Sequence, residues 1–255
     1  MPNANSDVYV LILVGEFHAE RLAGCWRDAQ HLTRSDRIFL LCAEACEQHV
    51  IEACPGLRTA NIVLPPEDRG TAPAITLAMV QMGLAGASTH DPVLLVRGDE
   101  PAANSPFASA AKQLALRLCV EQPALVCLAS PATGPTAPFA WLGLGSALEV
   151  ADETLSARKV LQVRTAAGLS ESQQYRDSTA WCWAEGSLAF RHGYMGYLLG
   201  EVREELDVAM LLAGCLQQDD HQALAAEYAL MPALSFEEAV LSAAPELISV
   251  QTLSR

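Results

Sequence analysis

The chain has 255 residues, of which 51% are hydrophobic and 18% charged, and its formal net charge is −14. This composition excludes an intrinsically disordered protein, because the apolar content is high enough to form a large core. The balance of 30 acidic against 16 basic residues argues against a nucleic-acid partner, because phosphate backbones bind clustered cations.

No apolar segment has the length that is needed to cross a bilayer, and residues 1–7 lack the basic start of a signal peptide. The eight cysteines lie within apolar runs, which is typical of reduced, buried thiols rather than of a disulfide framework. These features predict a cytoplasmic protein that does not associate with membranes.

Short apolar runs alternate with helical patterns through the first half of the chain. Such alternation predicts an α/β fold in which a mostly parallel sheet carries helices on both faces. The predicted strands are residues 8–14, 37–41, 61–64, 93–96 and 124–128. The predicted helices are a stretch that ends near residue 32, residues 43–53, a long helix from Thr71, and residues 106–121.

The second half of the chain is less regular. It contains no internal repeat and no flexible linker, so we expect one domain over residues 1–255, with the second half built onto the first sheet. Its predicted elements are a loop at 129–138, weak strands around 139–143, 158–164 and 180–190, helices from about 192 to 243, and a strand at 247–250.

Polar residues that directly follow strands are candidates for a site, because open α/β sheets bind ligands outside the carboxyl ends of their strands. Asp99 follows the fourth predicted strand and could hold Mg²⁺ and a phosphate, or could instead cap the next turn. Thr71 is predicted to cap its helix, whose free N–H groups could bind an anion with help from Arg69. The alternative is an ordinary capped helix beside a solvated arginine. The patterns G-x-G-x-x-G and G-x-x-x-x-G-K-[ST] are absent, which argues against a dinucleotide-binding dehydrogenase or a P-loop enzyme.

Four segments resemble, in the same order, the sugar-1-phosphate nucleotidyltransferases, and most closely the bacterial mannose-1-phosphate guanylyltransferases. Residues 61–74 match a strand followed by E-P-x-x-R-N-T-A-P-A, and residues 93–100 match a strand ending L-P-A-D-H. Residues 181–191 match Y-x-W-N-S-G-M-F-x-F-R, and residues 234–240 match S-I-D-Y-A-V. The resemblance spans nearly the whole chain and implies a Rossmann-like, three-layer αβα nucleotidyltransferase fold.

The resemblance also implies where each function would lie. Residues 1–130 would form the nucleotide-binding half and residues 131–255 the sugar-binding half, without the C-terminal β-helix of many relatives. Arg21 and Asp99 would be catalytic, and Asp99 and Glu237 would hold Mg²⁺. The implied nucleotide-binding residues are Gly15, Arg69, Thr71, Ala72 and Pro73, and the implied sugar-binding residues are Trp141, Trp183 and Glu185.

Several positions depart from the family pattern. The signature loop G-G-x-G-T-R reads V-G-E-F-H-A-E-R at residues 14–21, so that Glu16 and Glu20 place negative charge where phosphates would lie. The sugar segment E-T-G-Y-G-Y reads T-A-P-F-A-W at residues 136–141, without its glycines. Two lysines of the family pattern correspond to Ala29 and to a position near Arg164. Two of its asparagines correspond to Gly70 and Ala184.

These departures decide the functional expectation, because the loss of one preorganised donor costs about 2.7–4 kcal/mol of transition-state stabilisation. We expect a weakly active or inactive relative that binds a nucleotide or nucleotide sugar, or that serves as a regulatory scaffold for a protein partner or a second copy of itself. One alternative is an active transferase that converts a sugar-1-phosphate and a nucleoside triphosphate to a nucleotide sugar and pyrophosphate, with an altered substrate. Another is an interaction scaffold whose cleft is filled by Phe17, His18 and Trp141.

Overall fold

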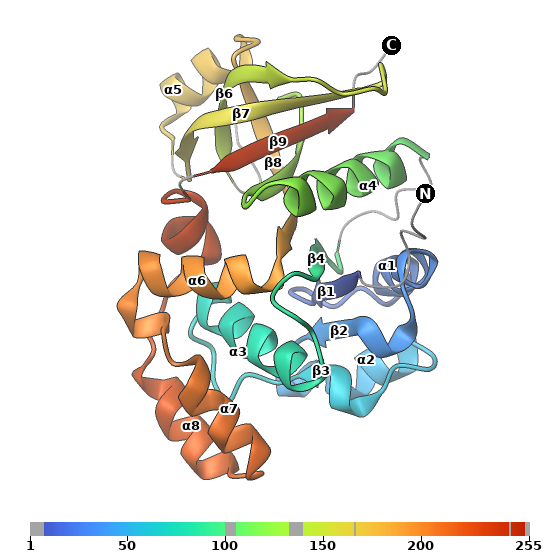
Figure 1. Ribbon diagram of the computed structural model, residues 1–255, viewed down its shortest axis with the longest axis vertical. Helices are drawn as coiled ribbons and strands as arrows, with labels where there is room; N and C mark the ends of the chain where they lie inside the picture. The colour runs from blue at the N-terminus through green and yellow to red at the C-terminus, as the bar shows by residue number, and fades with distance from the viewer. Residues whose placement is uncertain (1–7, 100–105, 133–139, 166, 245, 253–255) are drawn as a thin grey trace.

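Nine strands form one sheet in the part of the chain that the structure describes, in the order β3-β2-β1-β4-β8-β5-β9-β7-β6. The computed structural model describes residues 8–99, 106–132, 140–165, 167–244 and 246–252 (Figure 1). The strands are β1 (Tyr9–Leu13), β2 (Ile38–Leu41), β3 (Ile62–Val63), β4 (Pro92–Arg97), β5 (Leu125–Ser130), β6 (Trp141–Leu148), β7 (Leu155–Arg164), β8 (Trp181–Arg191) and β9 (Leu247–Thr252).

The sheet is mostly parallel, as the alternation of strands and helices predicts. Strands β1, β2, β3 and β4 pair in parallel, and so do β5 and β9. Only β7 and β8, among the strands described, run against the others, because β8 pairs antiparallel with both β4 and β5 and β7 pairs antiparallel with β9.

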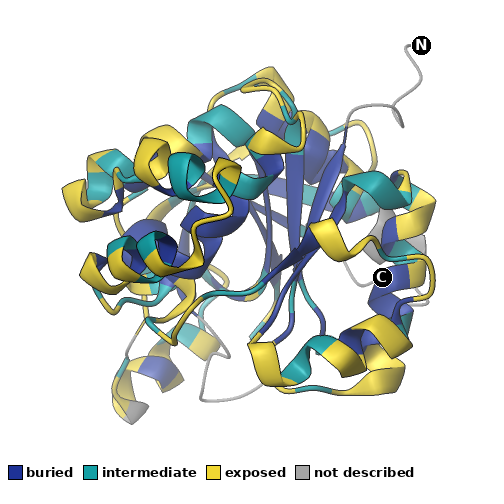
Figure 2. Ribbon diagram, turned by 90° about the horizontal axis from the view of Figure 1, so that it is seen from below, coloured by how far each residue is buried: buried dark blue, intermediate teal, exposed yellow. Residues whose placement is uncertain are grey.

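Helices cover both faces of the sheet, and each face has its own apolar core. Successive residues of β1 divide between the two cores: Val10 and Ile12 pack with α1, α2 and α4, whereas Tyr9 and Leu11 pack with α3 and α6. Because side chains alternate along a strand, a strand buried on both faces must be apolar throughout, which explains the continuous run at the start of the chain. Figure 2 shows these buried central strands between helices whose outer faces are exposed.

The helices agree in part with the sequence-based expectations. They are α1 (Ala19–Leu32), α2 (Glu47–Ala53), α3 (Thr71–Leu84), α4 (Pro106–Glu121), α5 (Leu169–Arg176), α6 (His192–Val202), α7 (Ala209–Gln217) and α8 (His221–Leu230). Short 3-10 turns occupy η1 (Ser35–Arg37), η2 (Glu44–Cys46), η3 (Thr59–Asn61) and η4 (Glu204–Leu206), and η5 (Glu237–Leu241) is a π-helical turn. None of the described helices has both the length and the apolar character that a membrane crossing requires.

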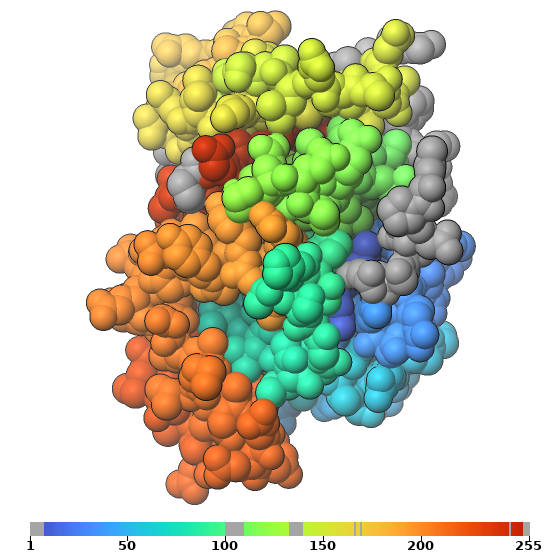
Figure 3. Space-filling model, viewed as in Figure 1, coloured from blue at the N-terminus to red at the C-terminus, as the bar shows by residue number. Residues whose placement is uncertain are grey.

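The second half closes a small ring of strands that the sequence pattern does not indicate. β6 pairs antiparallel with β7 and also with the start of β8, where Trp141 lies opposite Trp183. Pairing therefore runs from β8 through β5, β9, β7 and β6 and back to β8. This ring forms the upper part of the molecule in Figure 1, with α5 beside it. The space-filling view of the same side shows the ring at one end of the molecule and α7 and α8 at the other (Figure 3).

One prediction about a helix cap is wrong, and one helix has no counterpart among the predicted elements. Thr71 is the first residue of α3 and not its cap; Gly70 is the cap, and the Thr71 hydroxyl accepts a hydrogen bond from the Phe236 N–H at 2.8 Å. Helix α5 was not predicted, because its sequence L-S-E-S-Q-Q-Y-R has only a weak apolar period.

Candidate functional site

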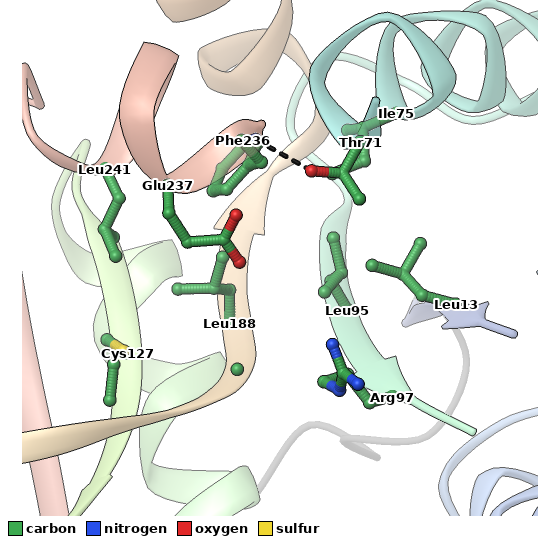
Figure 4. A pocket seen from close by; sticks show the side chains of 12 residues that line it. Leu13, Thr71, Ile75, Leu95, Arg97, Cys127, Leu188, Phe236, Glu237 and Leu241 are labelled. Carbon is green, nitrogen blue, oxygen red and sulfur yellow. Dashed lines mark hydrogen bonds between the residues drawn. The ribbon is translucent and has the colours of Figure 1, made fainter. Parts of the chain in front are cut away.

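The candidate site lies at the carboxyl ends of β1 and β4, where the two parallel strands end side by side. Leu13, the last residue of β1, pairs in register with Arg97, the last residue of β4. Both line a pocket that also touches α3, β5, β8 and η5 (Figure 4). This is the place at which open α/β sheets bind ligands.

The pocket has mostly apolar walls and little space. Its polar side chains are those of Thr71, Arg97 and Glu237, and the last two are its charged groups. In Figure 4 Glu237 extends from η5 and Arg97 from the end of β4. Apolar side chains leave room for little more than a water-sized group between them. They include Leu13, Ile75, Leu95, Leu188, Phe236 and Leu241.

Asp99, the predicted metal ligand, is bound by the arginine two residues before it. Nε of Arg97 donates to Oδ1 of Asp99 at 2.9 Å, and a terminal nitrogen of the same guanidinium donates to Oδ2 at 2.5 Å. Partial burial acts to raise the pKa of Asp99, but the hydrogen bonds and charge of Arg97 outweigh it and hold the pKa below its ordinary value. Asp99 is therefore a carboxylate whose two oxygens both accept from a cation of the protein.

We predict that Asp99→Asn lowers the free energy of unfolding by about 1 kcal/mol near neutral pH. The folded pKa lies below the unfolded value of about 3.9, so the pair stabilises the fold above that value and loses its contribution as the pH falls through the folded pKa. Urea unfolding at about pH 7 and about pH 3 should show the difference between wild type and variant shrinking in acid. A difference that is the same at both pH values would contradict the ionised pair.

Arg21, the other predicted catalytic residue, reaches the same point from α1. Its terminal Nη1 donates to the backbone oxygen of Asp99 at 3.1 Å. The structure thus places the Arg21 guanidinium against the Asp99 backbone and adds Arg97, and the catalytic roles of Arg21 and Asp99 stay predictions. Sequence reasoning missed Arg97, because β4 ends at this residue and Asp99 lies in the turn that follows, so that no strand spacing relates the two side chains.

Glu237 lies in the pocket, but the residues present do not fit a magnesium site. Mg²⁺ requires oxygen ligands in near-octahedral geometry, and Asp99 already gives both of its oxygens to Arg97. Within the described ranges no group of three or more His, Cys, Asp or Glu residues could hold a metal ion.

The predicted nucleotide-binding residues before and within α3 bond to the segment 231–236. Nε of Arg69 donates to the Met231 carbonyl at 2.6 Å, and its Nη1 donates to Glu67 at 2.7 Å. The Ala72 N–H donates to the Leu234 carbonyl at 3.1 Å, and Pro73 has no N–H. Their assignment to a nucleotide stays a prediction, and it requires a ligand to displace these bonds.

Gly15 opens the loop after β1 and is exposed, with no atom within 4 Å of where a Cβ would lie. Beside it the exposed Glu16 carboxylate lies near the His18 imidazole, with 3.7 Å between Oε2 and Nε2. The Phe17 ring packs against His49, with 5.2 Å between ring centroids. Phe17 is one of the side chains that were expected to fill the cleft, and its ring packs against α2.

The predicted sugar-binding residues lie on β6 and β8. Trp141 is only 2% exposed and contacts the rings of Tyr175 and Trp183 edge-on, so its ring belongs to the core. Trp183 is half-buried, and its Nε1–H meets no acceptor among the described residues. Residues 136–139 of the sugar segment lie outside the described residues.

Glu185 follows Trp183 on β8 and is exposed as a whole, although its carboxyl group is partly desolvated. Desolvation raises the pKa of Glu185 above its ordinary value, against the hydrogen bond from Ser130 and the charge of Lys112. Its role in sugar binding stays a prediction.

The sequence matches no protein-family model, and no curated protein is similar to it. Solved structures do resemble the fold. The mannose-1-phosphate geranyltransferase of Thermus thermophilus is 19% identical with a TM-score of 0.77, covering 97% of this chain and 74% of that one. The mannose-6-phosphate isomerase of Helicobacter pylori is 13% identical with a TM-score of 0.74, covering 98% of both chains. The likeness confirms the nucleotidyltransferase-like α/β fold that the sequence predicts.

Proposed function

We propose that the chain is a diverged relative of the sugar-1-phosphate nucleotidyltransferases, nearest to those that act on mannose-1-phosphate, and that it binds a nucleotide or nucleotide sugar with weak or no transferase activity. The fold supports the general class, since the two similar structures are both named for mannose phosphates. We assign the nucleotide to residues 1–130 and the sugar to residues 131–255.

One observation carries the proposal of weak or absent catalysis: the carboxylate of Asp99 is paired bidentately with Arg97. Nucleotidyl transfer depends on cations that neutralise the charge developing on the phosphates as pyrophosphate leaves. A carboxylate engaged by an arginine is poorly placed to recruit a metal ion for this purpose. The acidic loop after β1, with Glu16 and Glu20, adds repulsion towards a triphosphate.

Two observations support a retained binding role. Arg21 and Arg97 bring positive charge to the carboxyl ends of β1 and β4, and arginine guanidinium groups are suited to phosphate oxygens. The Trp183 Nε1–H is itself buried and has no acceptor among the described residues, so a sugar hydroxyl that reached it would satisfy this donor.

A regulatory scaffold is the second candidate, and the narrow pocket favours it. Side chains such as Leu13, Phe236 and Leu241 leave too little room for a nucleotide unless the walls move apart. In that case the fold would serve a protein partner or a second copy of the chain, and no nucleotide would stabilise it.

Thermal unfolding with nucleotides and nucleotide sugars separates the two candidates. Binding at 100 times the dissociation constant should stabilise the fold by about 2.7 kcal/mol, which is a visible rise in Tm. We expect this rise with GTP or GDP-mannose, and none with mannose alone, which lacks the phosphates. No rise with any nucleotide at millimolar concentration would reject the binding role and leave the scaffold.

A further inference from the structure

Three side chains, those of Arg21, Arg97 and Asp99, gather at the carboxyl ends of β1 and β4, and the Glu237 carboxylate lines the same pocket as Arg97. Asp99 accepts two hydrogen bonds from Arg97, and the Arg21 guanidinium donates to the Asp99 backbone carbonyl at 3.1 Å. Arg97 ends β4 and lines the pocket, and Arg21 is exposed on the first turns of α1. Two cations and one anion thus lie at the position where the sequence predicts a metal ion.

The pairing of Asp99 with Arg97 disfavours a divalent cation at this position. A magnesium ion here would have to break a bidentate ion pair and would then lie beside two guanidinium groups, which repel it. A phosphate gains from the same arrangement, because a guanidinium held rigidly by a carboxylate loses little side-chain freedom when it binds. Glu237 lines the same pocket, and its carboxylate can accept hydrogen bonds from hydroxyl groups.

We propose that this site binds the phosphate group of a sugar phosphate or nucleotide sugar without a divalent metal. Arg97 and Arg21 supply the positive charge, and Asp99 is a positioning residue that orients Arg97. The inference rests on the proposed function for the nature of the ligand, but it makes its own claim about metal dependence.

The chain contains a matched control for the Arg97–Asp99 pair. Arg34 and Asp36 are also two residues apart, and Nε and a terminal nitrogen of Arg34 donate to the two Asp36 oxygens, both at 3.1 Å. Hydrogen bonding to Arg34 lowers the pKa of Asp36 too. This second pair is exposed at the start of η1 and does not line the pocket, so Arg34→Met removes an equivalent pair outside the site.

Isothermal titration calorimetry with GDP-mannose and with inorganic pyrophosphate tests the inference, each in Mg²⁺ and each in EDTA. We expect the dissociation constants in EDTA to lie within about threefold of those in Mg²⁺. Arg97→Met should weaken binding by about 10- to 100-fold, as expected for a lost charge-assisted hydrogen bond. Arg21→Met should weaken binding less, and Arg34→Met should leave it unchanged. Because Arg21 is exposed, Arg21→Met is expected to fold, and it tests the site even if Arg97→Met does not fold.

Each outcome bears on a different claim. Binding of GDP-mannose in Mg²⁺ alone would overturn metal independence and leave the proposed function intact. Binding of pyrophosphate without GDP-mannose would support the metal-free phosphate site and reject the nucleotide-sugar ligand. Binding that Arg97→Met and Arg21→Met leave unchanged would overturn the site, and no binding of either probe would overturn both claims.

Discussion

Gly70→Ala is expected to lower the free energy of unfolding by about 2–5 kcal/mol, the combined cost of backbone strain and overpacking. Gly70 has φ of 83° and ψ of 179°, a conformation that is essentially restricted to glycine. A Cβ at this position would lie 2.4 Å from the backbone oxygen of Leu234. Because that atom belongs to a backbone already bonded to Arg69 and Ala72, it has little freedom to move away.

Gly56→Ala is the matched control. Gly56 has nearly the same φ, 82°, but no atom lies within 4 Å of its would-be Cβ. Only the cost of a left-handed residue remains there, about 1–2 kcal/mol. Urea unfolding of the two variants should give a clearly larger loss for Gly70→Ala, and equal losses would show that the contact with Leu234 is not made in solution.

The same contact gives a physical reason for one departure from the family pattern. The asparagine expected before the T-A-P-A segment is Gly70 here. The segment 231–236 approaches the backbone of Gly70 so closely that any side chain would collide with it. We therefore expect Gly70→Asn, which restores the family residue, to destabilise this chain at least as much as Gly70→Ala.

Trp141→Ala is expected to cost about 3–5 kcal/mol of folding stability, as for other large aromatic residues removed from a core. The Trp141 ring is almost wholly buried and contacts Tyr175 and Trp183, with centroids 5.5 and 5.8 Å away. It anchors the junction at which β6 pairs with β8 and closes the strand ring.

Trp181→Ala provides the comparison, because Trp181 lies in the same aromatic group but is only half-buried. Its ring stacks on the Tyr175 ring with 3.9 Å between centroids, and its removal should lower the free energy of unfolding by less than the removal of Trp141. Denaturant unfolding measures both losses. If Trp141→Ala were as stable as wild type but lost ligand binding, the ring would be a ligand contact and the core assignment would be wrong.

The parallel half of the fold could be predicted because its signals are local. The strands β1, β2, β4 and β5 are buried on both faces, so each reads as an unbroken apolar run. The pairing of β6 with β8 could not be predicted, because it joins residues about forty positions apart and depends on the ring closing as a whole.

Some residues of the candidate site could likewise be predicted from local sequence, and others could not. Asp99 could be found because it directly follows an apolar strand, and Arg21 because it matched a family motif. The hydrogen bond from Arg69 to the Met231 carbonyl could not be predicted, because 162 positions separate the two residues and nothing local indicates the contact. The pairing of Arg97 with Asp99 could not be predicted either, because it forms across the turn that follows β4 and the family pattern directs the search to the carboxylate alone.

We propose that the chain keeps the fold and a phosphate site but turns over little or no substrate. The most direct test of this claim is pyrophosphate release by wild type, at enzyme concentrations comparable to substrate, with nucleoside triphosphates, sugar-1-phosphates and Mg²⁺. We predict no release above the rate without enzyme, although the same preparation is stabilised by a nucleotide or nucleotide sugar. Steady release that Asp99→Ala abolishes would show that Asp99 serves catalysis despite Arg97, and would contradict the claim.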